Sequence, residues 1–148
     1  MSWKVLLLSN GTRIIGQYSL GKIDPSLIEK VFVCDSKPYD ILNGAPVDEL
    51  DNFIECTELT AQDFVDLDEL LATKQRVYNV GDKVTLDDLP AGLYKILYNG
   101  TEVASVVSTG KMEFTVTAEG VYSIILDEKP CNEFTFTVHK ADQQPVQF

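Results

Sequence analysis

The second half of the chain consists of short apolar-rich segments that turn-forming residues separate at regular intervals. Apolar and polar residues alternate strictly at Phe134, Phe136 and Val138. Period-two alternation in short segments bounded by Gly, Pro and Asn is typical of antiparallel sandwiches. The predicted strands are 76–79, 83–86, 93–98, 102–107, 112–117, 121–126 and 133–138. The chain is therefore predicted to be mainly β, with a compact sandwich at its C-terminal end.

The first 58 residues predict a smaller β-sheet region. Asn10-Gly11 and Asn43-Gly44 each follow an apolar run, and both residues of an Asn-Gly pair accept the positive φ of a type I′ hairpin turn. The predicted strands are 5–9, 12–18, 31–34, 39–42 and 52–57.

One helix is predicted between these two regions, from residue 61 to residue 73. Thr60 and Asp63 have the spacing of a capping box. Apolar residues then recur at helical spacing, at Phe64, Leu67, Leu70 and Leu71. The predicted organisation is a β-rich region at 1–58, an acidic helix and linker at 59–75, a sandwich at 76–140 and an extended tail at 141–148.

The charge of the chain argues against several classes of partner. The net charge is −11, and the 12 Lys and Arg residues are scattered singly. Nucleic-acid binding depends on clustered basic residues, and an anionic membrane surface repels an acidic chain. The apolar run near the N-terminus is shorter than a secretory signal needs, and no run approaches the length of a membrane span. We expect synthesis in a cytoplasm, and neither nucleic acid nor membrane as partner.

The three cysteines, Cys34, Cys56 and Cys131, are odd in number and far apart. A disulfide framework normally has an even count. They are predicted to be reduced core residues.

Motifs of common catalytic centres are missing from the sequence. No phosphate-binding glycine loop, nucleophile elbow, Cys-x-x-Cys pair or His-Glu-x-x-His zinc motif occurs, and His139 is the only histidine. The sequence therefore predicts a non-enzymatic protein with no catalytic residue, no cofactor and no metal ligand. A hydrolase that uses two carboxylates is the open alternative, because sequence alone cannot place such a pair in one cleft.

An acidic stretch lies between Lys37 and Lys74, where ten Asp and Glu residues occur without a basic residue. Three interpretations are open: a solvated face, a docking face for a basic surface, or a calcium site, although no twelve-residue EF-hand loop fits. The candidate partner-binding residues are Asp48, Glu49, Asp51, Asp63, Asp66, Asp68 and Glu69.

The segment from Ala118 to Ile124 resembles the entry to strand F of immunoglobulin-like domains, where a Tyr closes the corner by bonding to upstream backbone. Tyr122 holds that place here. Ile124 stands where the family often has Cys, and the only Trp is Trp3. The resemblance therefore implies a generic immunoglobulin-like antiparallel β-sandwich rather than an antibody-type domain.

The layout as a whole resembles small accessory proteins of tailed bacteriophages, as in Leu89–Tyr94 and Glu113–Tyr122. The resemblance implies a virion structural protein, a head decoration or tail-associated component, made in the host cytoplasm and then carried by the virion. Its partners would be capsid or tail proteins and other copies of itself as an oligomer. The alternative is a soluble acidic binding module or assembly chaperone for a basic protein.

Overall fold

The computed structural model describes residues 3–140 and divides the chain into two compact units. Unit 1 comprises Met1–Leu67 and Leu126–Asn132, and unit 2 comprises Asp68–Ile125 and Glu133–Phe148. Strands make up 51% of the described residues and helices 7%, which confirms the predicted mainly β class. The predicted tail at 141–148 lies outside the described residues.

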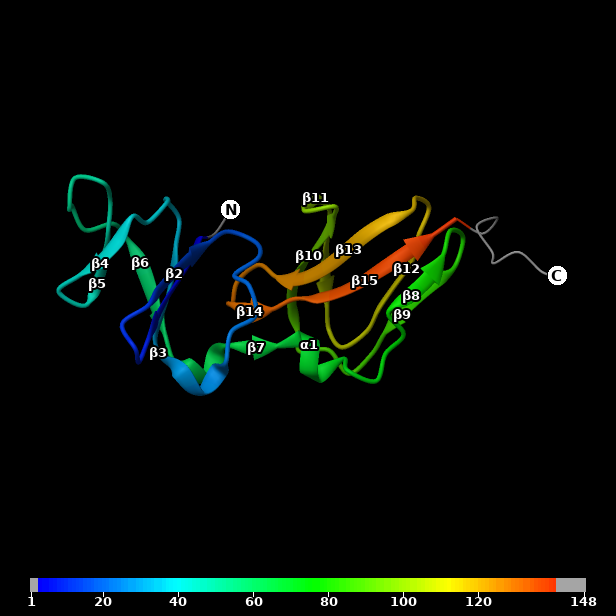
Figure 1. Cartoon of the computed structure of the whole chain (residues 1–148), viewed down its shortest axis with the longest axis horizontal. Coiled ribbons are helices and arrows are strands. Elements are labelled where there is room, and N and C mark those ends of the chain that lie inside the picture. Colours follow the sequence, from blue (N-terminus) through cyan, green and yellow to red (C-terminus); the bar gives the residue numbers. More distant parts are fainter. Residues whose placement is uncertain (1–2, 141–148) are drawn as a thin grey trace. The chain divides into compact units, whose positions relative to one another are not determined.

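Unit 1 is built on a four-stranded antiparallel sheet in the order β2-β1-β3-β6 (Figure 1). Two short 3-10 helices, η1 and η2, lie in the connections. The elements of the unit are β1 (Trp3–Leu8), β2 (Arg13–Gly16), η1 (Pro25–Leu27), β3 (Ile28–Cys34), β4 (Asp40–Leu42), β5 (Ala45–Val47), β6 (Cys56–Leu59), η2 (Ala61–Asp63), β7 (Val65–Asp66) and β14 (Cys131–Asn132).

Both faces of this sheet are buried, because successive side chains of β1 point to opposite sides. Leu6 packs with Val31 and Phe64 in one core, whereas Val5 packs with Phe32 and other residues in a second core. An almost continuous apolar run in β1 is thus explained by two layers of covering structure.

The β1–β2 turn differs from the predicted type I′ turn. Only Gly11 has a positive φ, +86°, and the Gly11 N–H donates to Leu8 O at 2.9 Å. The Leu8 N–H donates to Thr12 O, so the loop holds three residues, with glycine in the left-handed position. At Asn43-Gly44 both φ values are positive, +51° and +81°, as the prediction requires.

The predicted helix at 61–73 is wrong in extent. After η2 the backbone is extended at Phe64 and β7 follows, and the one α-helix within residues 3–140, α1, spans Leu67–Leu70. The Val65 N–H donates to Pro130 O, and β7 pairs in parallel with β14. This long-range pairing, together with the burial of Phe64 in the core, overrides the helical spacing.

Asn132 holds the returning segment of unit 1 in place. Its side-chain Oδ1 accepts from the Ile23 N–H at 2.7 Å, and its Nδ2 donates to Ile23 O at 2.8 Å. Asn132 is 2% exposed, so both bonds are formed away from water. The Asn132 amide thus pairs both backbone polar groups of the buried Ile23, which would otherwise lack hydrogen-bond partners.

The prediction that all three cysteines are reduced is wrong for two of them. Cys34 and Cys56 face each other in the adjacent strands β3 and β6, with Cα atoms 4.2 Å apart, and they form a disulfide. Cys131 is buried and keeps its thiol. The odd number and wide separation of the cysteines were misleading, because the register of β3 against β6, which no local pattern reveals, brings Cys34 and Cys56 together.

Unit 2 contains a five-stranded sheet, in the order β11-β10-β13-β15-β8, and a second pair, β12-β9. The pairs β10–β11, β13–β15 and β9–β12 are antiparallel, and β8 pairs with β15 in parallel. Besides α1, the elements of this unit are β8 (Val77–Asn79), β9 (Lys83–Leu86), β10 (Gly92–Tyr98), β11 (Thr101–Ser108), β12 (Met112–Thr115), β13 (Gly120–Leu126) and β15 (Phe134–His139).

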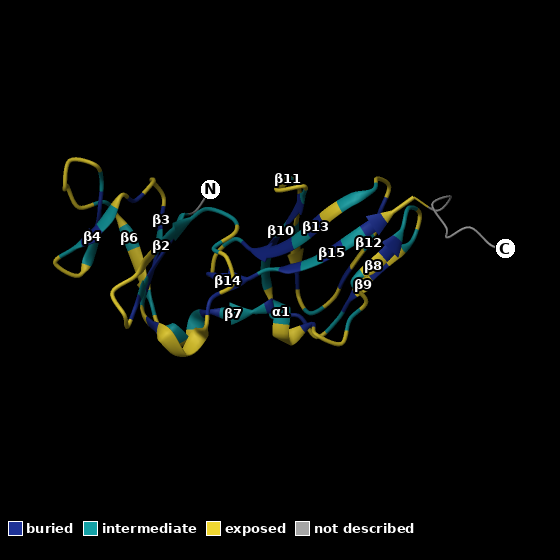
Figure 2. Cartoon of the chain, in the orientation of Figure 1, coloured by how far each residue is buried: buried dark blue, intermediate teal, exposed yellow. Residues whose placement is uncertain are grey.

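An aromatic cluster forms the core between these two layers. The Phe136 ring is 5.3 Å from the stacked Tyr122 ring and 5.3 Å from the Tyr78 ring, between centroids. Phe114 on β12 approaches Phe136 at 6.1 Å and so joins the two-stranded layer to the five-stranded one. Figure 2 shows buried residues along β13 and β15. The strict alternation at Phe134 and Phe136 thus marks the face turned to the core.

Two tyrosines close equivalent corners of unit 2. The Tyr122 hydroxyl donates to Ala118 O at 2.9 Å, and the Tyr94 hydroxyl donates to Pro90 O at 2.6 Å. Both bonds reach back four residues, and burial raises the pKa of Tyr122. The similarity of the segments at 91–97 and 119–125 therefore reflects a shared corner. The corner bond at Tyr122 is the one the immunoglobulin-like resemblance implies, and that family assignment stays a prediction.

Removing either corner hydroxyl should destabilise the protein. Tyr94→Phe and Tyr122→Phe each delete one hydrogen bond and leave a carbonyl without its partner, so each should lower the free energy of unfolding by about 1–2 kcal/mol. Urea unfolding followed by circular dichroism measures the change. Tyr39→Phe, at a position 63% exposed, is the matched control and should change it by less than about 0.5 kcal/mol. If all three variants changed the free energy of unfolding equally, the corner hydrogen bonds would not contribute to the stability of unit 2.

Candidate functional site

The most exposed apolar surface of unit 1 lies on a lobe of residues 35–55. The lobe contains the β4–β5 hairpin, and the Cys34–Cys56 disulfide closes its base. Ile41 and Ile54 pack from the lobe onto Val5 and Phe32 of the sheet. One side of the lobe is thereby anchored in the core, and the loops around β4 and β5 are largely exposed (Figure 2).

Asp48 builds the loop that follows β5. Its Oδ1 accepts from the N–H groups of Leu50 at 2.9 Å and of Asn52 at 3.0 Å. The Asp51 N–H donates to Asp48 O, and Asp51 has a φ of +62°. Asx-type bonds of this kind replace regular backbone pairing in a tight loop. They hold Leu50 at the outer end of the loop, where its side chain is 80% exposed.

Three large apolar side chains of the lobe face solvent. Tyr39 is 63% exposed and Phe53 is 62% exposed, besides Leu50. Folding normally buries such side chains, and each exposed one forgoes roughly 1.5–3 kcal/mol of burial free energy. Single exposed apolar residues are ordinary, but three large ones on one lobe, two of which line the same hollow, make the lobe a candidate interaction surface.

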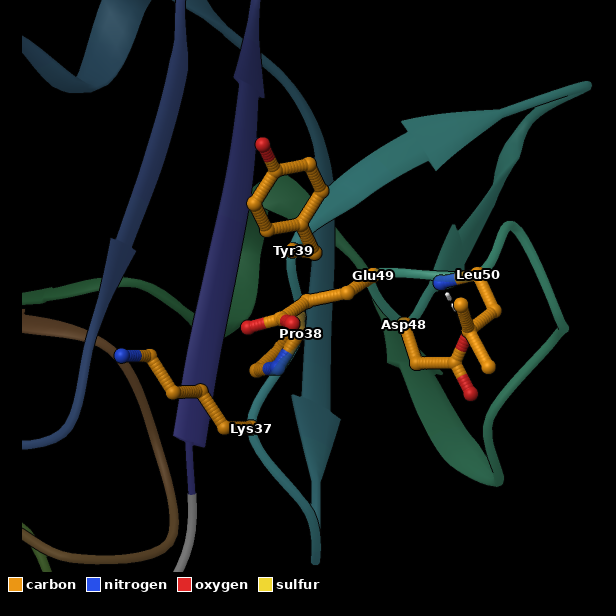
Figure 3. A pocket seen from close by; sticks show the side chains of 6 residues that line it. All are labelled: Lys37, Pro38, Tyr39, Asp48, Glu49 and Leu50. Carbon is orange, nitrogen blue, oxygen red and sulfur yellow. Dashed lines mark hydrogen bonds between the residues drawn. The ribbon is translucent and has the colours of Figure 1, made fainter.

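A hollow of about 430 Å³ lies on this lobe. Figure 3 shows the side chains that line it, with the bond from the Leu50 N–H to Asp48 drawn as a dashed line. The lining residues are Lys37, Pro38, Tyr39, Asp48, Glu49 and Leu50. Apolar and charged groups thus share one concave surface.

The charge of the lobe is mainly negative at its rim. Glu49 and Asp51 are exposed, and Asp48 is half-buried. The lobe's only basic side chain, Lys37, lies over the ring of Trp3 with its Nζ 5.5 Å from the centroid. Asp40 binds Arg13, whose Nε is 2.7 Å away. Apolar anchors surrounded by exposed carboxylates form the usual composition of a docking surface, and the sign favours a basic partner.

The seven predicted partner-binding residues do not form one site. Asp48, Glu49 and Asp51 lie on the lobe, but Asp63 and Asp66 lie in and after η2, and Asp68 and Glu69 belong to unit 2. The Asp63 carboxylate accepts from the Thr60 N–H and hydroxyl, and these bonds hold its pKa below the usual value. Asp68 pairs with Arg76 at 2.9 Å. Asp63 and Asp68, like Asp48, therefore have structural partners within the fold.

Tyr39, Leu50 and Phe53 were not among the predicted partner-binding residues. Tyr39 and Phe53 lie in the predicted strands 39–42 and 52–57, which gave them a place in a sheet. Leu50 stands between acidic residues outside any predicted strand or helix, and that position was the available signal.

Within residues 3–140, no group of three or more His, Cys, Asp or Glu side chains is placed to hold a metal ion. In the same part of the chain, no helix has the length and apolar composition to cross a membrane. His139, the only histidine, is exposed at the end of β15.

Comparison with protein-family models, curated proteins and solved structures found no match to this chain.

Proposed function

We propose that this protein acts without catalysis, by docking the 35–55 lobe onto another protein, as an accessory component of a virion. The observation that carries the proposal is the exposure of Tyr39, Leu50 and Phe53 on one disulfide-closed lobe. A few large side chains commonly supply most of the binding free energy of an interface. Carboxylates at the rim, such as Glu49, add orientation and selectivity.

The disulfide agrees with a virion component in two ways. It reduces the freedom of the lobe before binding, and a pre-organised surface loses less entropy on association. Virion surfaces also belong to the oxidising environments in which disulfides persist. Head decoration and tail attachment both fit, with capsid or tail proteins as the partners.

Electron cryo-microscopy of purified particles tests this proposal. The expected result is density for the chain at a fixed number of copies per particle, with the lobe against the capsid or tail. Absence of the protein from purified particles would refute the virion assignment.

A second candidate function, a binding module or assembly chaperone for a basic protein, is favoured by the exposed carboxylates of Glu49 and Asp51 beside the apolar anchors. Such a complex should weaken steeply as salt screens the charges, whereas an apolar docking contact should not. Pull-down of a partner at low and high salt separates the two candidates. Release of the partner at high salt supports the chaperone, and retention argues against it.

A further inference from the structure

The edge strand β11 carries a second interaction surface, separate from the lobe. β11 is the longest strand and pairs with β10 on one side. Among residues 3–140, no strand pairs with its other side, where its outer N–H and C=O groups are open to addition of a strand.

The usual protection of an exposed edge is weak here. Monomeric proteins place lysine, proline or other charges on such strands to prevent pairing with another chain. β11 contains neither lysine nor proline, and its only charged residue, Glu102, is 3.3 Å from Lys95 of β10. The side chains of Val103 and Val107 are 56% and 77% exposed.

One protective feature limits the available edge to five residues. The register between β10 and β11 shifts so that Val103 has no partner, which marks a β-bulge. From Ala104 to Ser108 the pairing is regular, residue for residue. These five residues carry no charge, in a chain whose net charge is −11.

The five-stranded sheet is incompletely covered by the two-stranded one near β11. Two strands, β9 and β12, oppose a five-stranded sheet. A mostly apolar hollow of about 340 Å³ is left, and its lining includes Val103 and Ala104 of β11 and Phe114 of β12. A strand added beside β11 would place alternate side chains toward this hollow, which would remove apolar surface from water.

We propose that the strand added to β11 is the β11 of a second copy, so that two copies form a two-fold symmetric dimer with a continuous sheet. Antiparallel pairing centred on Val106 places Ala104 opposite Ser108 and Ser105 opposite Val107. No charged residue faces another in this register, and the two-fold axis passes through the Val106 pair and repeats every other pair on its far side. Two acidic copies repel each other, and the uncharged segment at 104–108 lets the two edges approach without placing like charges together.

Sedimentation equilibrium of the full chain tests the proposal. The wild-type protein is expected to form a species of twice the 16.5 kDa chain mass, and higher salt should strengthen it by screening the repulsion between copies. Val107→Lys introduces a charge on the paired edge and should raise the dimer dissociation constant by more than about tenfold. Val107 is largely exposed, so the variant should fold normally, with an unchanged circular dichroism spectrum.

Val77→Lys is the matched control. It makes the same substitution at a side chain 55% exposed on β8, the opposite edge of the same sheet. This variant should dimerise like the wild type. A wild-type protein that is monomeric at every concentration would overturn the proposal, as would equal effects of the two lysines. Neither result bears on docking by the lobe, which lies in the other unit.

Discussion

Replacing Cys34 and Cys56 together by alanine is expected to lower the free energy of unfolding of unit 1 by about 3 kcal/mol. The two residues are 22 positions apart, and cross-linking a loop of that length removes entropy of this size from the unfolded chain. For a unit of this size the melting temperature should fall by roughly 10–20 °C. The same change should loosen the lobe and weaken any docking that depends on its shape.

Trp3 provides the measurement, because the only tryptophan of the chain lies in β1 of unit 1. Thermal unfolding followed by its fluorescence should show the shift. Reduction of the wild-type protein should reproduce it, whereas the double variant should not respond to the reductant. A wild-type melting curve that is the same with and without reductant would contradict the role given to the disulfide.

Replacing Phe136 by alanine is expected to lower the free energy of unfolding of unit 2 by about 3–5 kcal/mol. The ring is 1% exposed and contacts the rings of Tyr78, Phe114, Tyr122 and Phe134, so its removal leaves a cavity at the centre of the aromatic cluster. Chemical denaturation followed by circular dichroism measures the loss.

Phe53→Ala is the control, because it makes the same substitution where the side chain is 62% exposed. It should lower the free energy of unfolding by less than about 1 kcal/mol. If the two variants lost equal stability, Phe136 could not be the centre of the core.

The strands of the second half could be predicted closely because their signals are local. The bounds of β9 are those predicted, and β10 and β13 each begin one residue earlier than expected, at a glycine. Alternation and turn residues act within a few positions of one another, so a short window of sequence contains them.

The predicted turn at Asn10-Gly11 differed only locally, whereas the larger errors came from contacts between distant parts of the chain. The helix predicted at 61–73 gives way to pairing with β14, more than 60 residues away. The disulfide depends on the register of β3 against β6. Of the candidate site, only the acidic residues, such as Glu49 and Asp51, were predicted from the sequence. The exposure of Leu50 could not be predicted, because it follows from the loop that the Asp48 side chain holds by hydrogen bonds.

The central claim is that the exposed apolar side chains of the lobe bind the partner. Particles assembled without this chain can be mixed with purified protein, and the bound fraction can be measured after sedimentation. The account predicts that the double variant Leu50→Ser with Phe53→Ser binds more than about tenfold more weakly than the wild type. Leu70→Ser, at a side chain 50% exposed outside the lobe, should bind normally. Equal binding by the lobe variant and the wild type would contradict the account.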